Sequence, residues 1–121
     1  MSNTQFRFQD MEIWQKGVSL SGPIFALADE LDQKRKHRFA EQLRAATLSI
    51  TNSIAEGSGS LSKADFANFL NTARRSVFEV ANILPVLSQH GQLAGAEVRP
   101  LLPVLEEESR MILAFIRTLK S

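Results

Sequence analysis

The densest group of side chains that could do chemistry is basic and lies in the middle of the chain. Residues 34–75 carry eight basic and three acidic side chains. Arginine and lysine at this density can contact phosphate groups, with an affinity that falls as the salt concentration rises. The candidates for contact with an RNA or DNA backbone are Lys34, Arg35, Lys36, Arg38, Arg44, Lys63, Arg74 and Arg75.

The alternative interpretation of this basic segment is an ordinary solvated surface, which a charge run taken alone favours. The whole chain has 14 basic and 13 acidic side chains and a net charge of +1, so its overall balance does not indicate a nucleic-acid-binding protein. That balance is a cancellation, because residues 1–33 have two basic and five acidic side chains and residues 76–121 have four and five. Both interpretations therefore stay open, and symmetry in an oligomer would multiply the basic segment.

Other side chains with catalytic or metal-binding chemistry are few. The chain has no cysteine, and its two histidines, His37 and His90, lie far apart without metal-binding spacing. The acidic run Glu106 to Glu108 is expected to be a solvated face, because consecutive helical positions point about 100° apart. Gly57 to Ser60, with Lys63 beside it, is at most a weak anion site that helix capping explains as well. We expect no enzyme activity, no metal site and no cofactor.

The length and the termini bound the class of protein. A chain of 121 residues and 13.5 kDa is the size of one domain, so we expect a single unit over residues 1–121. The first ten residues are polar and do not form a secretory signal, and no apolar run approaches the roughly 20 residues that a membrane span needs. We therefore expect a soluble, cytoplasmic protein without a membrane partner.

Helical spacing of the apolar residues predicts an all-α fold. We expect four helices at about residues 10–31, 36–57, 62–89 and 96–119, with Asp10 as the first N-cap and a capping box at Ser62. Short connections between long helices favour an antiparallel up-down-up-down four-helix bundle. Pro23 and Pro85 should bend their helices without breaking them, whereas Pro100 and Pro103 make the start of the last helix uncertain.

The expected first helix carries more apolar surface than one bundle core needs. One stripe contains Met11, Trp14, Val18 and Phe25, and a second contains Ile13, Leu20, Ile24, Leu27 and Leu31. We expect the second stripe to form a subunit interface, although an inner helix wrapped by its neighbours would explain both stripes. Inward positions on the next two helices are expected to include Phe39, Leu43, Ala46, Ile50, Ile54, Phe66, Phe69, Leu70 and Val77.

Four short motifs occur in order along the chain: DMEIWQK at 10–16, QLRAA at 42–46, NSIAEGSG at 52–59 and FANFL at 66–70. In this order they resemble the four-helix-bundle proteins that are encoded by intervening sequences of large-subunit ribosomal RNA genes. They are also similar to the related accessory variability proteins of diversity-generating retroelements. The resemblance covers the chain from Phe8 to Leu119.

The resemblance implies an antiparallel bundle that assembles as a homopentamer and has no known catalytic residues. Its retroelement branch implies nucleic-acid binding by a basic surface and a protein partner such as a reverse transcriptase. A protein–protein interaction scaffold without a nucleic-acid role is the alternative. The positions that match the family signature are Trp14, Asn52, Ile54, Ala55, Glu56 and Gly57.

We expect a structural role for these signature positions. Ile54 and Ala55 should pack, and Gly57 should supply the C-terminal turn of its helix. Asn52 and Glu56 share a helical face, where they could bond to each other or to a neighbouring subunit.

Overall fold

The computed structural model describes residues 6–120. The expectation that the first ten residues are not a secretory signal therefore lies partly outside the described residues. Within the described range the chain is all-α, with four long helices and no strand. The elements are the 3-10 helix η1 (Arg7–Asp10), α1 (Glu12–Gln33), α2 (His37–Ser58), α3 (Lys63–Gln89), α4 (Gly95–Val98) and α5 (Leu101–Lys120). The predicted fold class is confirmed at this level.

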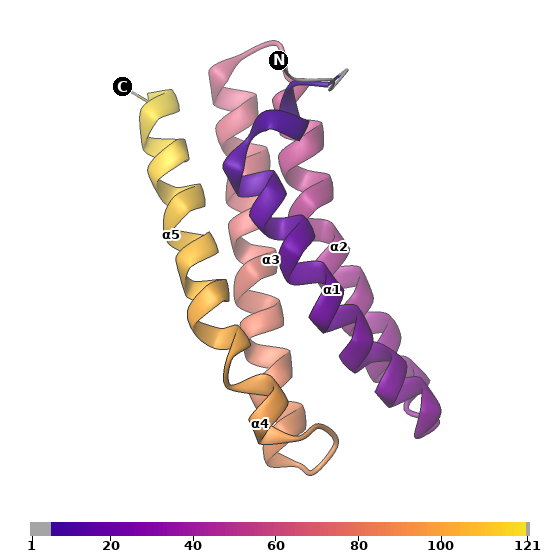
Figure 1. The fold of residues 1–121 in the computed structure, drawn as a ribbon. Coiled ribbons are helices and arrows are strands. Elements are labelled where there is room, and N and C mark those ends of the chain that lie inside the picture. The colour runs from indigo at the N-terminus through magenta and orange to yellow at the C-terminus, as the bar shows by residue number, and fades with distance from the viewer. Residues whose placement is uncertain (1–5, 121) are drawn as a thin grey trace.

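The long helices pack side by side in chain order (Figure 1). α2 lies between α1 and α3, and α5 packs mainly on α3. α5 also contacts α1, along a narrower seam than those between the other neighbouring long helices. The bundle is therefore least tightly packed between α1 and α5. No helix in residues 6–120 is long and apolar enough to cross a membrane.

The apolar stripe of α1 that was expected at a subunit interface lies in the core. Ile13, Leu20, Ile24, Leu27 and Leu31 are all buried in the core of the bundle, so the expectation that they form a subunit interface is wrong. On the other stripe Val18 is exposed, Trp14 and Phe25 are half-buried, and Met11 is buried. The core therefore uses the stripe with the larger number of branched side chains, and the surplus apolar surface lies on the outside of α1.

The inward positions of α2 are confirmed at Leu43, Ala46, Ile50 and Ile54, and only the first predicted position is wrong. Ala40, rather than Phe39, takes the first core position, and Phe39 is 42% exposed. Buried positions then follow at spacings of three and four residues: Ala40, Leu43, Thr47, Ile50 and Ile54. Phe69 on α3 is likewise exposed at the edge of its stripe.

The helix ends correct two further expectations and confirm one. Met11, not Asp10, is the N-cap of α1, because Asp10 belongs to η1. Ser62 caps α3 as predicted, and its hydroxyl accepts a hydrogen bond from the Asp65 amide at 3.1 Å. The expected last helix is interrupted at Arg99 and Pro100, which separate α4 from α5.

The prolines inside the two other helices do not break them. α1 runs through Pro23 and α3 runs through Pro85. Pro103 lies in the first turn of α5, where its missing amide proton would have had no helical partner.

Candidate nucleic-acid interface

The basic cluster begins at the turn that ends α1. The Lys36 amide donates to the Leu31 carbonyl at 2.8 Å, and the Arg35 amide donates to the Asp32 carbonyl at 2.9 Å. This pair of bonds is the Schellman motif, in which the residue after the C-cap adopts a left-handed backbone and is usually glycine. Here that residue is Arg35, with a φ of 62°.

α3 ends in the same motif with the usual residue. The Gln92 amide donates to the Leu87 carbonyl at 2.8 Å, and the left-handed position is Gly91, with a φ of 75°. A side chain in this conformation costs roughly 1 kcal/mol that glycine avoids. Arg35 in the α1–α2 turn therefore has a backbone conformation that is less favourable for arginine than for glycine.

Lys34 and His37 in this turn already have partners. The Lys34 ammonium donates to the Gln92 carbonyl at 2.9 Å, which ties the α1–α2 turn to the loop after α3. His37 Nδ1 lies 2.7 Å from Asp32 Oδ1.

The other three cations of the turn face solvent. Arg35, Lys36 and Arg38 are exposed and make no ion pair among the described residues. With His37 and Phe39 they line one open hollow of about 430 Å³. Sequence reasoning missed Phe39 as a surface residue; the spacing of Ala40, Leu43 and Thr47 was the signal that could have shown it.

Arg44 is occupied by carboxylates of the neighbouring helix. One of its terminal nitrogens lies 2.6 Å from Asp29 Oδ1 and 2.7 Å from Asp32 Oδ2. Hydrogen bonds from His37 and Arg44 hold the pKa of Asp32 below its ordinary value, and the bonds to Asp29 and Asp32 raise the pKa of Arg44. The structure thus assigns Arg44 to a link between α1 and α2.

The remaining three candidates lie away from the turn. Lys63 starts α3 at the opposite end of α2, a helix of 22 residues and so about 33 Å long. The Arg74 guanidinium donates to the Ser109 carbonyl at 3.2 Å and lies 5.0 Å from the Phe78 ring centroid, whereas Arg75 is exposed beside it. The eight candidates form one compact group of four and several separate positions.

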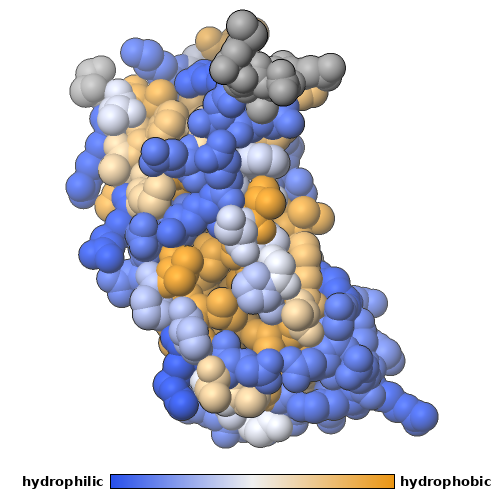
Figure 2. Space-filling model, in the orientation of Figure 1, coloured by the Kyte–Doolittle hydropathy of each residue, from blue (hydrophilic) through white to orange (hydrophobic). Residues whose placement is uncertain are grey.

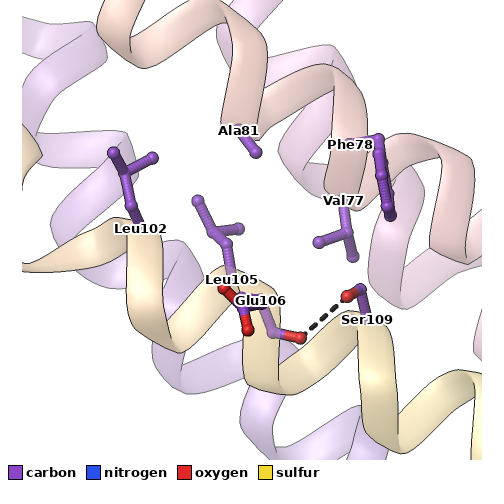
Figure 3. A pocket seen from close by; sticks show the side chains of 7 residues that line it. All are labelled: Val77, Phe78, Ala81, Leu102, Leu105, Glu106 and Ser109. Atoms are coloured by element: carbon purple, nitrogen blue, oxygen red, sulfur yellow. Dashed lines mark hydrogen bonds between the residues drawn. The ribbon is translucent and has the colours of Figure 1, made fainter.

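A second hollow lies between α3 and α5, with a volume of about 230 Å³ (Figure 3). Its walls are mainly apolar, and its polar side chains are those of Glu106 and Ser109, where the Ser109 hydroxyl donates to the Glu106 carbonyl at 2.7 Å. Within residues 6–120 no three His, Cys, Asp or Glu side chains gather in a group that could hold a metal ion. This hollow offers shape and apolar contact, and its polar side-chain groups are one carboxylate and one hydroxyl.

Glu108 corrects the expectation that the acidic run is a solvated face. Its side chain is 0% exposed, and neither carboxylate oxygen has a hydrogen-bond partner among the described residues. Burial raises the pKa of Glu108 to about 8, although the nearby Lys16 lowers it. Glu108 falls on the inward stripe with Leu105 and Ile112, so its position in the helix outweighs its charge.

A family model matches residues 9–114, and its description is 23S rRNA-intervening sequence protein. The chain belongs to the 23S rRNA-intervening sequence protein family. The match spans α1, α2 and α3 and extends into α5 as far as residue 114, which confirms the resemblance indicated by the ordered motifs.

The fold of this chain is similar to that of a protein with a known crystal structure. It is described as a protein with unknown function from the S23 ribosomal protein family of Bacteroides thetaiotaomicron VPI-5482, and the two chains superpose with a TM-score of 0.80. The sequences are 22% identical, and the alignment covers 86% of this chain and 97% of the other. A comparison with curated proteins finds no match.

The family signature around Gly57 packs α2 closely on α3. Ile54 is fully buried, Ala55 is half-buried, and a Cβ built on Gly57 would lie 2.6 Å from Phe69 Cβ and 3.0 Å from Phe66 Cδ1. The expectation that Gly57 supplies the C-terminal turn is wrong: α2 continues to Ser58, and its C-cap is Gly59, with a φ of −87°. Gly57 is required for close approach of two helices, not for a left-handed backbone.

The other signature residues divide between packing and surface. Trp14 is half-buried and meets the Phe8 ring edge-on, with centroids 5.1 Å apart. Asn52 and Glu56 are exposed on α2, and the structure describes no hydrogen bond between them. Their predicted bond to a neighbouring subunit stays a prediction.

Proposed function

We propose that this family member is a non-enzymatic binding protein that contacts the backbone of RNA or DNA through the α1–α2 turn. The observation that carries the proposal is the group of three solvent-facing cations, Arg35, Lys36 and Arg38, in four consecutive residues. Each cation that meets a phosphate releases condensed counterions, which gives affinity without sequence readout.

We further propose that the binding unit is a homo-oligomer of antiparallel up-down-up-down bundles, a pentamer by resemblance to its relatives. Exposed apolar side chains occur on two different faces of the chain, with Val18 and Leu48 on α1 and α2, and Phe78 and Val86 on α3. Unlike faces that join head to tail close into a ring when the rotation allows it. A ring would repeat the cationic turn once in each subunit.

Binding can be tested with a fluorescent single-stranded RNA of mixed sequence, titrated at several salt concentrations. The wild type should bind, and the triple variant Arg35→Gln, Lys36→Gln and Arg38→Gln should bind more weakly and with a shallower salt dependence. On single strands each lost phosphate contact lowers the slope of log K against log salt by about 0.7. A matched control removes three cations elsewhere, by Lys63→Gln, Arg75→Gln and Arg117→Gln.

The control variant decides whether the turn is the site. Equal weakening in both triple variants would mean that general charge attracts the RNA, and the α1–α2 turn would lose its assignment. No binding by the wild type at low salt would overturn the nucleic-acid proposal as a whole.

Oligomer formation has an independent test in light scattering coupled to gel filtration. The expected mass is several times the 13.5 kDa of the chain. The position to substitute is Leu48. It is 49% exposed and lines a hollow together with Phe25. Leu48→Glu should lower the mass without unfolding the helices, and a monomeric wild type would overturn the proposed assembly.

A protein-interaction scaffold is the second candidate function, and exposed apolar surface favours it. Figure 2 shows hydrophobic side chains gathered on the face between α1 and α5, bordered by hydrophilic residues. α5 leaves Val104, Met111 and Phe115 half-buried. A partner protein that stays bound through nuclease treatment and high salt, while the triple cation variant retains it, would favour this function over the first.

A further inference from the structure

The hollow at the α1–α2 turn combines cations with an aromatic ring. Phe39 lines it together with Arg35, Lys36, His37 and Arg38. We propose that this hollow is a site for single-stranded nucleic acid, in which the Phe39 ring stacks on a base while the neighbouring arginines and lysine contact phosphates. The inference rests on the proposed function and adds to it the form of the nucleic acid and the residue that selects it.

The Phe39 ring is available for stacking. The ring is apolar and yet Phe39 is 42% exposed, because Ala40 occupies the core position beside it. Several other rings in the described part of the chain are engaged: Phe8 packs on Trp14, and Phe66 packs on Phe115. Phe39 takes part in no ring–ring or cation–π contact of the described residues.

The cations beside the ring are free to meet a ligand. Lys34 and His37 hold protein partners, and these contacts with Gln92 and Asp32 fix the backbone around the turn. Arg35, Lys36 and Arg38 have no such contact and border the same hollow as the ring. A basic groove with an aromatic platform is the combination that binds single strands without sequence preference.

A duplex would use only part of this site. Its bases are stacked inside the helix, so a side chain outside the groove meets phosphates and sugars but not base faces. The cations should therefore contribute to binding of both forms, whereas Phe39 should contribute only to binding of a single strand. The difference between the two forms isolates the ring from the charges.

The experiment compares one labelled strand alone and annealed to its complement, in RNA and in DNA versions. Phe39→Leu keeps an apolar side chain of similar bulk and removes the aromatic face. Stacking of one base contributes about 1–3 kcal/mol, so single-strand affinity should fall roughly 5- to 150-fold while duplex affinity is unchanged. Phe78→Leu, at a 56% exposed phenylalanine on α3, is the matched control and should change neither affinity.

A second variant reports on stacking directly. Phe39→Trp should preserve single-strand binding, and its indole fluorescence should be quenched when the strand binds, after subtraction of the signal of Trp14. A Phe39→Leu variant that binds single strands as tightly as the wild type would overturn the stacking role. So would an equal loss for single strands and duplex.

The possible failures can be told apart. If the wild type binds both forms equally and only the cation variants weaken binding, the proposed function stands and the single-strand site falls. If the wild type binds neither form at low salt, both proposals fall. Binding of RNA but not DNA, with the Phe39 dependence intact, would support the site and assign its additional contacts to the ribose hydroxyl.

Discussion

Gly17 on α1 faces the buried carboxylate of Glu108 on α5. A Cβ built on Gly17 would lie 3.4 Å from Glu108 Oε2 and 2.9 Å from Thr51 Cγ2 on α2. Three helices therefore meet around one glycine, and the space that its missing side chain leaves is filled by Glu108 and Thr51. This contact lies in the seam where α5 meets α1.

Gly17→Ala should destabilise the protein by about 1–3 kcal/mol, because the added methyl group overlaps a packed β-branched side chain. Gly22→Ala on the same helix is the control, since no atom lies within 4 Å of its built Cβ. That exposed substitution should raise stability by roughly 0.5–1 kcal/mol through helix propensity. Urea unfolding at a fixed protein concentration measures both, and equal effects would contradict the packing described at Gly17.

Glu108→Gln should remove a pH dependence of stability. The pKa of Glu108 is raised from 4.5 to about 8, so between these values the folded state holds a proton that the unfolded state has lost. The stability that this proton contributes is complete below about pH 4.5 and is lost by about pH 8. The loss is at most about 1.4 kcal/mol per pH unit.

The variant and the wild type should accordingly be similar near about pH 5, and the variant should become the more stable as the pH approaches about 8. Unfolding midpoints measured across this range give the comparison. Glu106→Gln changes an exposed carboxylate of the same run and should leave the slope of the wild type intact. Parallel pH profiles for wild type and Glu108→Gln would show that Glu108 is ionised throughout.

Gly57→Ala should be among the most destabilising single substitutions in the chain, with a loss of about 3 kcal/mol. The new Cβ would lie 2.6 Å from Phe69 Cβ, an atom next to the α3 backbone, so the two helices must separate. Gly59→Ala is the control two residues away, because its nearest atom is 3.5 Å distant and its φ of −87° suits alanine. If thermal unfolding ranks Gly59→Ala as the more harmful, the close approach at Gly57 is not what the signature preserves.

Arg35→Gly should make the protein more stable and a weaker binder. Glycine relieves the left-handed backbone at φ 62°, which should raise the free energy of unfolding by roughly 1 kcal/mol. Removal of the guanidinium should lower the affinity for the labelled RNA and reduce its salt dependence. Gly91→Ala is the reciprocal control, with a φ of 75° and open space around its Cβ, and should lose a similar amount of stability.

A rise in stability without a loss of RNA affinity would remove Arg35 from the proposed site. Unfolding and binding are measured on the same preparation, so the two effects can be separated.

Much of the fold could be predicted from the sequence, because apolar spacing alone determines where long helices lie. The first inward position of α2 was assigned to Phe39 instead of Ala40, since both are apolar and hydrophobicity favours the larger side chain. Glu108 was missed because its charge was weighed above its position on the stripe of Leu105 and Ile112. Only packing could decide between these signals.

The candidate site was predictable only where it is local. Lys34, Arg35, Lys36 and Arg38 lie together in the sequence and so lie together in the turn. The partners of Arg44 are on another helix, and the contact of Arg74 with Ser109 spans 35 residues, so sequence proximity could not show that these cations are occupied. The exposure of Phe39 is likewise a result of how α2 is rotated against its neighbours.

The narrow seam between α1 and α5 divides the molecule into units that can open separately. α2 and α3 are the inner pair, whereas α1 rests mainly on α2 and α5 rests mainly on α3. Among the described residues, α5 also places an unpaired carboxyl group against α1. Such boundaries set the order in which backbone amides exchange with solvent, because parts with few contacts open without global unfolding. α1 and α5 are therefore the units that should exchange first, and alkaline conditions that ionise Glu108 should widen the difference in protection between these outer helices and the inner pair, α2 and α3.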